Sequence, residues 1–156
     1  MKLIWGIVAM AITASTALVQ AGGVNHYSAA QLKQMAHKLE QQESFRTTGS
    51  AAETLEKYPG SFTILSVRNT SGGAELHEHY ADIFFVVEGD ATLNSGGTVV
   101  DPKTTAPGEI RGTAVSGGVE QKLGKGDVVH IASNTPHQLS IPKGKTFIYF
   151  VVKVKE

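Results

Sequence analysis

From residue 61 to the C-terminus, the sequence consists of short runs in which apolar and polar residues alternate, separated by glycine-rich turns. An alternation with a period of two predicts strands, because successive side chains of a strand point to opposite faces. Many short strands at fairly regular spacing favour a sandwich or a barrel. We expect roughly seven to nine strands, and the clearest cover 62–68, 75–79, 83–88, 91–93, 128–131 and 146–155.

The first 21 residues have the features of a secretory signal peptide. Met1-Lys2 carries a positive charge, residues 3–19 are uncharged, and Val19-Gln20-Ala21 places small residues where a signal peptidase cleaves. An uncleaved membrane anchor is the alternative, but it needs about 20 apolar residues, and this run is shorter and contains hydroxyl side chains. We expect cleavage after Ala21 and a periplasmic or secreted protein with no membrane attachment after cleavage.

The mature chain is expected to be one domain of balanced charge. Removing 21 of the 156 residues leaves 135, the size of one ordinary domain. Without Lys2, 13 basic side chains stand against 14 acidic ones, so net charge gives no support for a nucleic acid partner or an anionic membrane surface. The chain has no cysteine, which excludes disulfides, thiolate chemistry and cysteine-type zinc sites.

An N-terminal helical arm, residues 22–58, is expected to precede a barrel domain at 59–156. Ser28 and Gln31 form a capping-box pattern, and apolar residues follow at helical spacing through about residue 42. The polar segment after it is ambiguous, and a second short helix over 51–57 is one interpretation. Within the barrel domain, the stretch 101–118 is rich in Pro, Thr and Gly. It predicts a mobile loop or an irregular hairpin.

Candidate metal ligands stand at the head of an apolar run in AELHEHYADIFFVVEG, residues 74–89. His77 and His79 lie two residues apart, so on one strand they would project to the same face. With the carboxylate of Asp82 they offer a donor set that suits divalent Fe, Mn, Zn or Ni. A His-x-His pair alone is weak evidence, but a second cluster, GDVVHIASNTPH, brings His137.

These two clusters resemble the two motifs of the cupin superfamily, and the chain is similar to its small single-domain, RmlC-like members. The first motif has His-x-His, three or four residues, an acid, six residues and a glycine. Here His77-Glu78-His79 precedes Asp82, and six residues separate Asp82 from Gly89. The second motif begins with a glycine and ends with a histidine, positions that Gly126 and His137 match.

The resemblance covers roughly residues 61–152 and implies an all-β fold, the double-stranded β-helix or jelly-roll barrel. It further implies one divalent transition metal ion held by His77, His79, Asp82 and His137, and a homodimer. The match has departures: only two residues separate His79 from Asp82, an Asp replaces the usual Glu, and Asn134 replaces a glycine. Asn tolerates the left-handed backbone. Asp82 is either a direct ligand or a residue that orients a histidine or a metal-bound water.

Other polar residues are weaker candidates. We expect His37 and Glu78 to lie on the surface, while Glu75 adjoins the proposed ligands in sequence. The candidates to line the cavity are Arg68, Phe84, His130 and Tyr149, with plain structure as the alternative role of His130. Two residues of the 101–118 stretch, Glu109 and Arg111, are candidates for a lid over the barrel mouth.

Two classes of function fit this sequence. One is a metal-dependent enzyme acting on a small organic molecule, of the oxygenase, isomerase, lyase or decarboxylase type, since a bound ion supplies Lewis acidity. The other is a non-catalytic protein that binds a small ligand or the metal itself. The fold alone does not choose between them. No second catalytic group is evident, so no catalytic residue is assigned.

Overall fold

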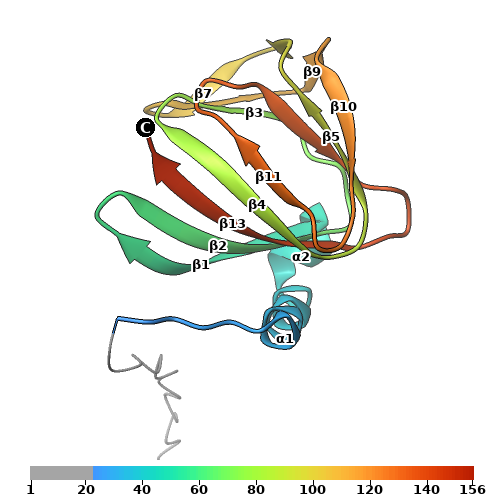
Figure 1. The fold of residues 1–156 in the computed structure, drawn as a ribbon. Coiled ribbons are helices and arrows are strands. Elements are labelled where there is room, and N and C mark those ends of the chain that lie inside the picture. Colours follow the sequence, from blue (N-terminus) through green and yellow to red (C-terminus); the bar gives the residue numbers. More distant parts are fainter. Residues whose placement is uncertain (1–22) are drawn as a thin grey trace, which may run out of the picture.

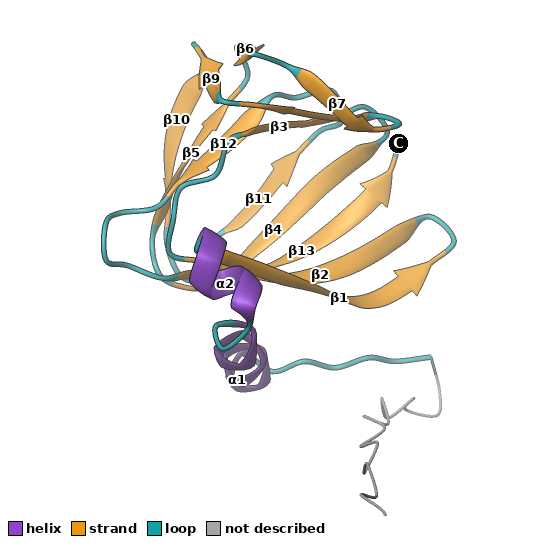
Figure 2. Cartoon of the chain, turned by 180° about the vertical axis from the view of Figure 1, so that it is seen from behind, coloured by secondary structure: helices purple, strands orange, loops and turns teal. Residues whose placement is uncertain are grey.

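The computed structural model describes residues 23–156, so the predicted signal peptide lies outside the described residues. Two antiparallel sheets face each other, and the two helices lie against the outer side of one of them (Figures 1 and 2). The prediction of an all-β architecture with a helical N-terminal part is confirmed. Among residues 23–156, no helix is long and apolar enough to cross a membrane.

The described chain begins with α1 (Ala29–Leu39) and α2 (Glu43–Thr48). The five-stranded sheet has the order β1-β2-β13-β4-β11, comprising β1 (Ser50–Tyr58), β2 (Ser61–Arg68), β13 (Phe147–Lys155), β4 (Tyr80–Glu88) and β11 (Val128–Ile131). The six-stranded sheet has the order β10-β5-β12-β3-β8-β7, comprising β10 (Val119–Leu123), β5 (Ala91–Ser95), β12 (His137–Ser140), β3 (Ala74–His77), β8 (Glu109–Gly112) and β7 (Lys103–Ala106). A small ribbon pairs β6 (Thr98–Val100) with β9 (Ala114–Ser116).

Alternation along the strands divides the apolar side chains into two main cores. The inner core lies between the two sheets and contains Phe84, Val86, Leu93, Leu139, Phe147, Tyr149 and Val151. The outer core packs Leu32, Ala36 and Leu39 of α1 against Leu65, Val67, Val87 and Ile148. In β2, β4 and β13, alternate residues therefore point into the barrel, and this alternation decides which of their polar side chains lie inside it.

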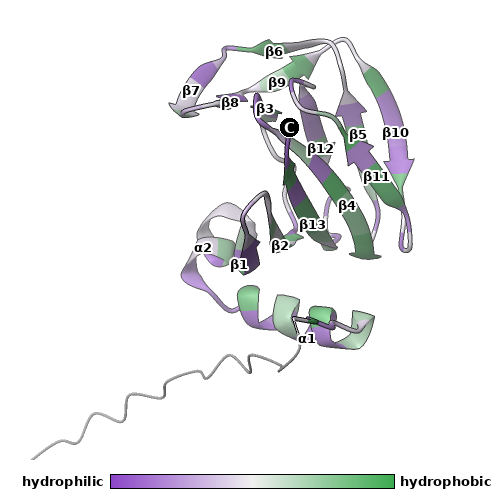
Figure 3. Ribbon diagram, turned by 60° about the vertical axis from the view of Figure 1, so that its left-hand side comes forward, coloured by the Kyte–Doolittle hydropathy of each residue, from purple (hydrophilic) through white to green (hydrophobic). Residues whose placement is uncertain are grey.

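Helix α1 begins as the sequence predicts. The hydroxyl of Ser28 accepts a hydrogen bond from the backbone N–H of Gln31, and the side-chain oxygen of Gln31 accepts one from the backbone N–H of Ser28. Apolar residues follow one side of this helix, while β4, β11 and β13 carry the apolar faces of the sheet (Figure 3). His37 is exposed and pairs with Glu40, as expected of a surface residue.

The expectation of a second helix over 51–57 is wrong. The helix lies earlier, at α2, and residues 50–58 form β1, which pairs along its length with β2. Gly49 ends α2 in the left-handed conformation, with a φ of 71°. The five-stranded sheet therefore starts at Ser50, nine residues before the expected start of the barrel domain at residue 59.

The stretch 101–118 is strand-rich and pairs with the rest of the protein. It contains β7, β8 and β9, and β7 and β8 form a hairpin with a register shift between Thr104 and Ala106. The irregular hairpin is thus confirmed, whereas a loop without strands is wrong. Sequence alternation is weak here because every residue of β7 is exposed, so neither face demands apolar side chains.

Candidate metal centre

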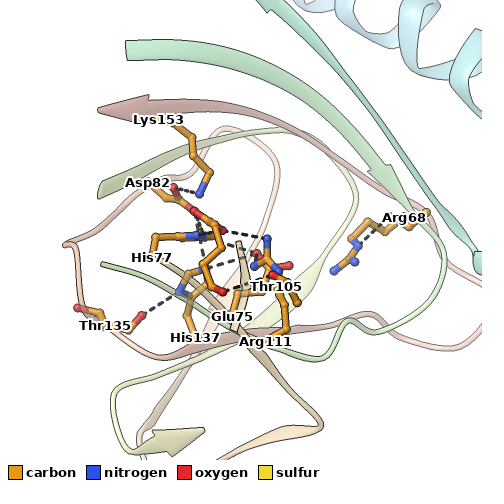
Figure 4. A network of polar contacts seen from close by, with 11 residues as sticks. Arg68, Glu75, His77, Asp82, Thr105, Arg111, Thr135, His137 and Lys153 are labelled. Atoms are coloured by element: carbon orange, nitrogen blue, oxygen red, sulfur yellow. Dashed lines mark hydrogen bonds and ion pairs between the residues drawn. The ribbon is translucent and has the colours of Figure 1, made fainter. Parts of the chain in front are cut away.

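Four polar side chains converge inside the barrel from both sheets (Figure 4). Glu75 and His77 come from β3, His137 from the adjacent β12, and Asp82 from β4 across the barrel. The imidazole Nε2 of His77 lies 3.6 Å from Oε2 of Glu75 and 3.4 Å from Oδ2 of Asp82. The Nε2 of His137 lies 4.0 Å and 3.7 Å from the same two oxygens.

Donor atoms of Glu75, His77 and His137 all lie within 4.8 Å of one another. One carboxylate and two imidazoles suit a divalent transition metal ion. Glu75 and His77 share a face of β3 because they lie two residues apart, and strand pairing sets His137 directly opposite Glu75. Asp82 is outside this group of three, although its Oδ2 lies closer to both Nε2 atoms than Oε2 of Glu75 does.

Both buried histidines are held through Nδ1, which leaves Nε2 facing the centre. The Nδ1 of His77 contacts Oε2 of Glu109 at 2.7 Å, and the Nδ1 of His137 contacts the carbonyl oxygen of Thr135 at 3.0 Å. Each acceptor fixes a proton on Nδ1, so Nε2 is the nitrogen that can bind a ligand in the neutral ring. Both Nε2 atoms are buried and lack a hydrogen-bond partner. These residues therefore fit a metal ion.

Each carboxylate of the centre has a cationic neighbour. Oε2 of Glu75 lies 2.8 Å from Nη1 of Arg111, and Oδ1 of Asp82 lies 2.6 Å from Nζ of Lys153. Burial acts to raise the pKa of Glu75, but bonding to His77 and the charge of Arg111 lower it to about 2. For Asp82, burial is likewise outweighed by His77 and Lys153, and its pKa is lowered. Both acids are therefore ionised at neutral pH.

The two histidines have opposite pKa shifts. Burial acts to lower the pKa of His77, but the carboxylates of Asp82 and Glu75, 3.4 Å and 3.6 Å from its Nε2, raise it to about 9. Burial dominates at His137 and lowers its pKa. Without a metal, His77 thus carries a proton at neutral pH and His137 does not. An ion that binds both Nε2 atoms has to displace the proton of His77.

The prediction that His77 and His79 face the same way is wrong. Strand β3 ends at His77, and residues 78 and 79 form a bend before β4, so His79 is exposed while His77 is only 3% exposed. The backbone N–H of Asn134 donates to the carbonyl of His77, and the N–H of Glu78 donates to the carbonyl of Gly108. The structure does not bring His79 to the other three predicted ligands.

Glu75, two residues before His77, lies in the donor group where His79 was expected. The sequence contained a signal for this shift, because only two residues separate His79 from Asp82, whereas the cupin motif has three or four. Counted from His77, four residues precede Asp82, and six then precede Gly89. The spacing of the motif therefore fits Glu75-x-His77 better than His77-x-His79.

The other candidates fall into three groups. Glu109 and Arg111 do not form a lid, since β8 pairs with β3 and sets them opposite His77 and Glu75. His130 is exposed on the outer side of the sheet and does not line the cavity, and Glu78 is exposed as expected. The expected lining residues are confirmed: Arg68, Phe84 and Tyr149.

A cavity of about 220 Å³ adjoins the centre. Its polar lining includes Ser66, Arg68, Glu75, His77, Asp82, Arg111 and Lys153, and its apolar lining includes Ile64, Phe84 and Val151. Tyr149 also lines it, and burial raises the pKa of this phenol to about 12, so it stays protonated at neutral pH. The arrangement can hold a small polar molecule against the metal centre.

Solved structures of other proteins share this architecture. An uncharacterized conserved protein with a double-stranded beta-helix domain from Klebsiella pneumoniae superposes with a TM-score of 0.56 at 13% identity, over 84% of this chain and 90% of that one. The cupin domain of Cnp3 from Schizosaccharomyces pombe gives 0.53 at 8% identity, over 70% and 66%. The chain has the cupin fold. The predicted double-stranded β-helix is confirmed.

A third solved structure of similar shape is the DMSP lyase DddQ from Ruegeria pomeroyi, with a TM-score of 0.51 at 15% identity, over 76% of this chain and 53% of that one. No protein-family model and no curated protein matches the sequence. At these identities the comparisons describe the cupin fold, and the chemistry has to be argued from the site.

Proposed function

We propose that this cupin binds one divalent transition metal ion (Fe, Mn, Zn or Ni) and uses it to act on a small organic molecule. The observation that carries the proposal is the pair of buried Nε2 atoms of His77 and His137, both without a partner and both facing carboxylates. A buried polar atom without a partner is costly unless a ligand satisfies it. Glu75, His77 and His137 would hold the ion, with Asp82 as a fourth ligand or as an acceptor for metal-bound water.

The bound ion would act as a Lewis acid that polarises an oxygen of the substrate. The chain's own residues prepare the site for it. Glu109 and Thr135 fix the tautomers and ring positions of the histidines. Lys153 pairs with Asp82, and Phe84 and Val151 form an apolar part of the cavity wall. An enzyme of the oxygenase, isomerase, lyase or decarboxylase type is the reading we favour, and the DMSP lyase with the same fold is consistent with a lyase.

The alternative is a non-catalytic protein that binds a small ligand or the metal. It is supported by the ion pairs of Glu75, Asp82, Arg111 and Lys153, which leave no acid lining the cavity without a basic partner among the described residues.

We also propose that the mature chain is exported to the periplasm or secreted, from the composition of its first 21 residues, and that it forms a homodimer. Fractionation of expressing cells and light scattering of the purified protein test these two points.

Turnover of a panel of small acids and phenols decides between the two classes. An enzyme should convert one of them, stop after treatment with a chelator, and recover when the metal returns. Tight binding of a panel member without any product would favour the binding protein. Activity that survives complete removal of metal would contradict the proposal.

A further inference from the structure

One cation of the cavity wall has no acidic partner. Three Arg or Lys side chains line the cavity: Arg68, Arg111 and Lys153. Arg111 pairs with Glu75 and Glu109, and Lys153 pairs with Asp82. Within residues 23–156, no carboxylate lies within 4.0 Å of the guanidinium of Arg68. Its one hydrogen bond to a side chain runs from Nε to the hydroxyl of Ser50, at 3.2 Å.

The fold holds this guanidinium toward the inside of the barrel. Leu65 and Val67 of β2 face the helices, so Ser66 and Arg68 face the cavity. Gly72 lies against the side chain, and a Cβ at that position would clash with Nη1 of Arg68. The missing side chain at Gly72 thus makes room for the guanidinium, which lies apart from the metal centre in Figure 4.

The balance of charge around the cavity favours an anionic occupant. The three cations of the wall are matched by three carboxylates, those of Glu75, Asp82 and Glu109. A divalent ion bound to neutral His77 and His137 would add two positive charges with no counterpart. Arg68 is the cation of the cavity wall that no carboxylate neutralises, so an anion could bind there. A guanidinium donates several N–H groups in a plane, which suits a carboxylate.

The size of the cavity limits the occupant to a small molecule. A water takes about 30 Å³ of liquid volume, so a cavity of about 220 Å³ has room for roughly seven non-hydrogen atoms. We propose that Arg68 binds the carboxylate of a small organic acid in this cavity. The inference takes the bound metal ion from the proposed function. The binding of a carboxylate by Arg68 can be tested both with and without metal.

Butyrate and butyramide are suitable probes, because they match in size and differ in charge. Their binding is titrated by ligand-observed NMR on the zinc-loaded protein and on the chelator-treated protein. We expect butyrate to bind more tightly than butyramide, and Arg68→Gln to weaken butyrate roughly 10- to 100-fold, the usual value of hydrogen bonds to a charged group. Butyramide affinity and zinc content should stay unchanged.

Two further variants separate a lost contact from a lost charge. Arg46→Gln removes the same charge from an exposed position on α2 and should bind butyrate like the parent. Gly72→Ala keeps the charge but displaces the guanidinium, so it should weaken butyrate as well. Circular dichroism checks that each variant is folded.

The possible failures are distinguishable. If the parent does not prefer butyrate, or if Arg68→Gln binds butyrate as the parent does, the role of Arg68 is wrong, whether or not zinc is bound. If zinc does not bind but butyrate binding depends on Arg68, the role of Arg68 stands and the metal centre is wrong.

Discussion

At the residue scale, the buried histidines differ from the exposed one in what surrounds their rings. His77 and His137 are each about 3% exposed, with Nδ1 held by an acceptor. His79 is exposed and has no such acceptor among the described residues. A ring that is already oriented binds a metal without further ordering. This difference predicts which histidine the site needs.

We therefore expect His137→Ala to remove most of the bound metal, since few ligands remain to compensate. His79→Ala should retain the metal content of the parent, which reverses the expectation from the His-x-His pattern. Elemental analysis of the purified variants measures both. Equal metal loss in the two variants would show that His79 takes part in the site.

The raised pKa of His77 predicts how pH acts on the site. Its pKa of about 9 lies above the ordinary 6.5, so its contribution to stability is fully present below pH 6.5 and is lost as pH rises through 9. Glu75 acts in the other direction, because its pKa is lowered from 4.5 to about 2, and its contribution is lost as pH falls through that range. The lowered pKa of His137 costs stability below pH 6.5, where the unfolded imidazole takes up a proton and the buried one does not. The metal-free protein should therefore be most stable near pH 6.5.

Zinc competes with the proton of His77, so its affinity should rise about tenfold per pH unit between pH 6 and 8. Titrations of zinc into the metal-free protein measure this slope. The difference in unfolding temperature between the zinc-loaded and the metal-free protein should also grow as pH rises. His137, whose pKa is lowered, adds no proton release in this range. A zinc affinity independent of pH would contradict the proposed role of His77.

At the element scale, the centre is built from pairs of residues on neighbouring strands. β8 sets Glu109 opposite His77, β12 sets His137 opposite Glu75, and β13 sets Lys153 opposite Asp82. Each pair lies on one face of its sheet, where opposed side chains interact directly. The register of β3 and β8 therefore controls the orientation of the His77 ring.

Glu109→Gln tests this control. The amide keeps the size of the side chain but weakens the bond that orients His77, so zinc affinity should fall by roughly 10- to 100-fold. Glu78→Gln, on an exposed residue of the neighbouring bend, is the matched control and should bind zinc as the parent does. Competition with a chromogenic chelator measures both affinities. Equal affinities would mean that Glu109 has no part in positioning His77.

Local patterns in the sequence predicted the elements better than the site. The alternation of Val128–Ile131 and of the last strand matches β11 and β13, and Asn134 has the left-handed conformation expected of it, with a φ of 59°. The expectation that residues two apart share a face failed at His79, because it holds only while a strand continues. At the end of β3, the N–H of Asn134 donates to the carbonyl of His77, and the N–H of Glu78 donates to the carbonyl of Gly108.

The cross-strand partners could not be read from local sequence at all. Lys153 belongs to an apolar strand, and its pairing with Asp82 depends on the register between β13 and β4, which are some 70 residues apart in the chain. Glu109 and Arg111 sit in a segment whose exposed strand β7 gives no alternation. Their positions follow from the pairing of β8 with β3.

At the scale of the whole molecule, the helical arm and the barrel share a core. Leu32, Ala36 and Leu39 are nearly fully buried against the five-stranded sheet. A chain without residues 1–21 should fold as a β-rich protein, because the helix and strand patterns of the sequence all begin at Ser28 or later.

A chain without residues 1–49 should lose about 3 to 6 kcal/mol of unfolding free energy, since burial of each large aliphatic side chain contributes about 1.5 to 3 kcal/mol. Urea unfolding of the two shortened chains measures the difference. Equal stability would show that the helices are not part of the core.

The central claim is that one ion binds between Glu75, His77 and His137. A crystal structure of the zinc-loaded protein, with anomalous diffraction recorded at the zinc edge, tests it most directly. We predict one peak inside the barrel, with the Nε2 atoms of His77 and His137 about 2.0 to 2.1 Å from it and an oxygen of Glu75 or Asp82 completing the set. A fully occupied peak on His79, or no peak between the two buried histidines, would contradict the account.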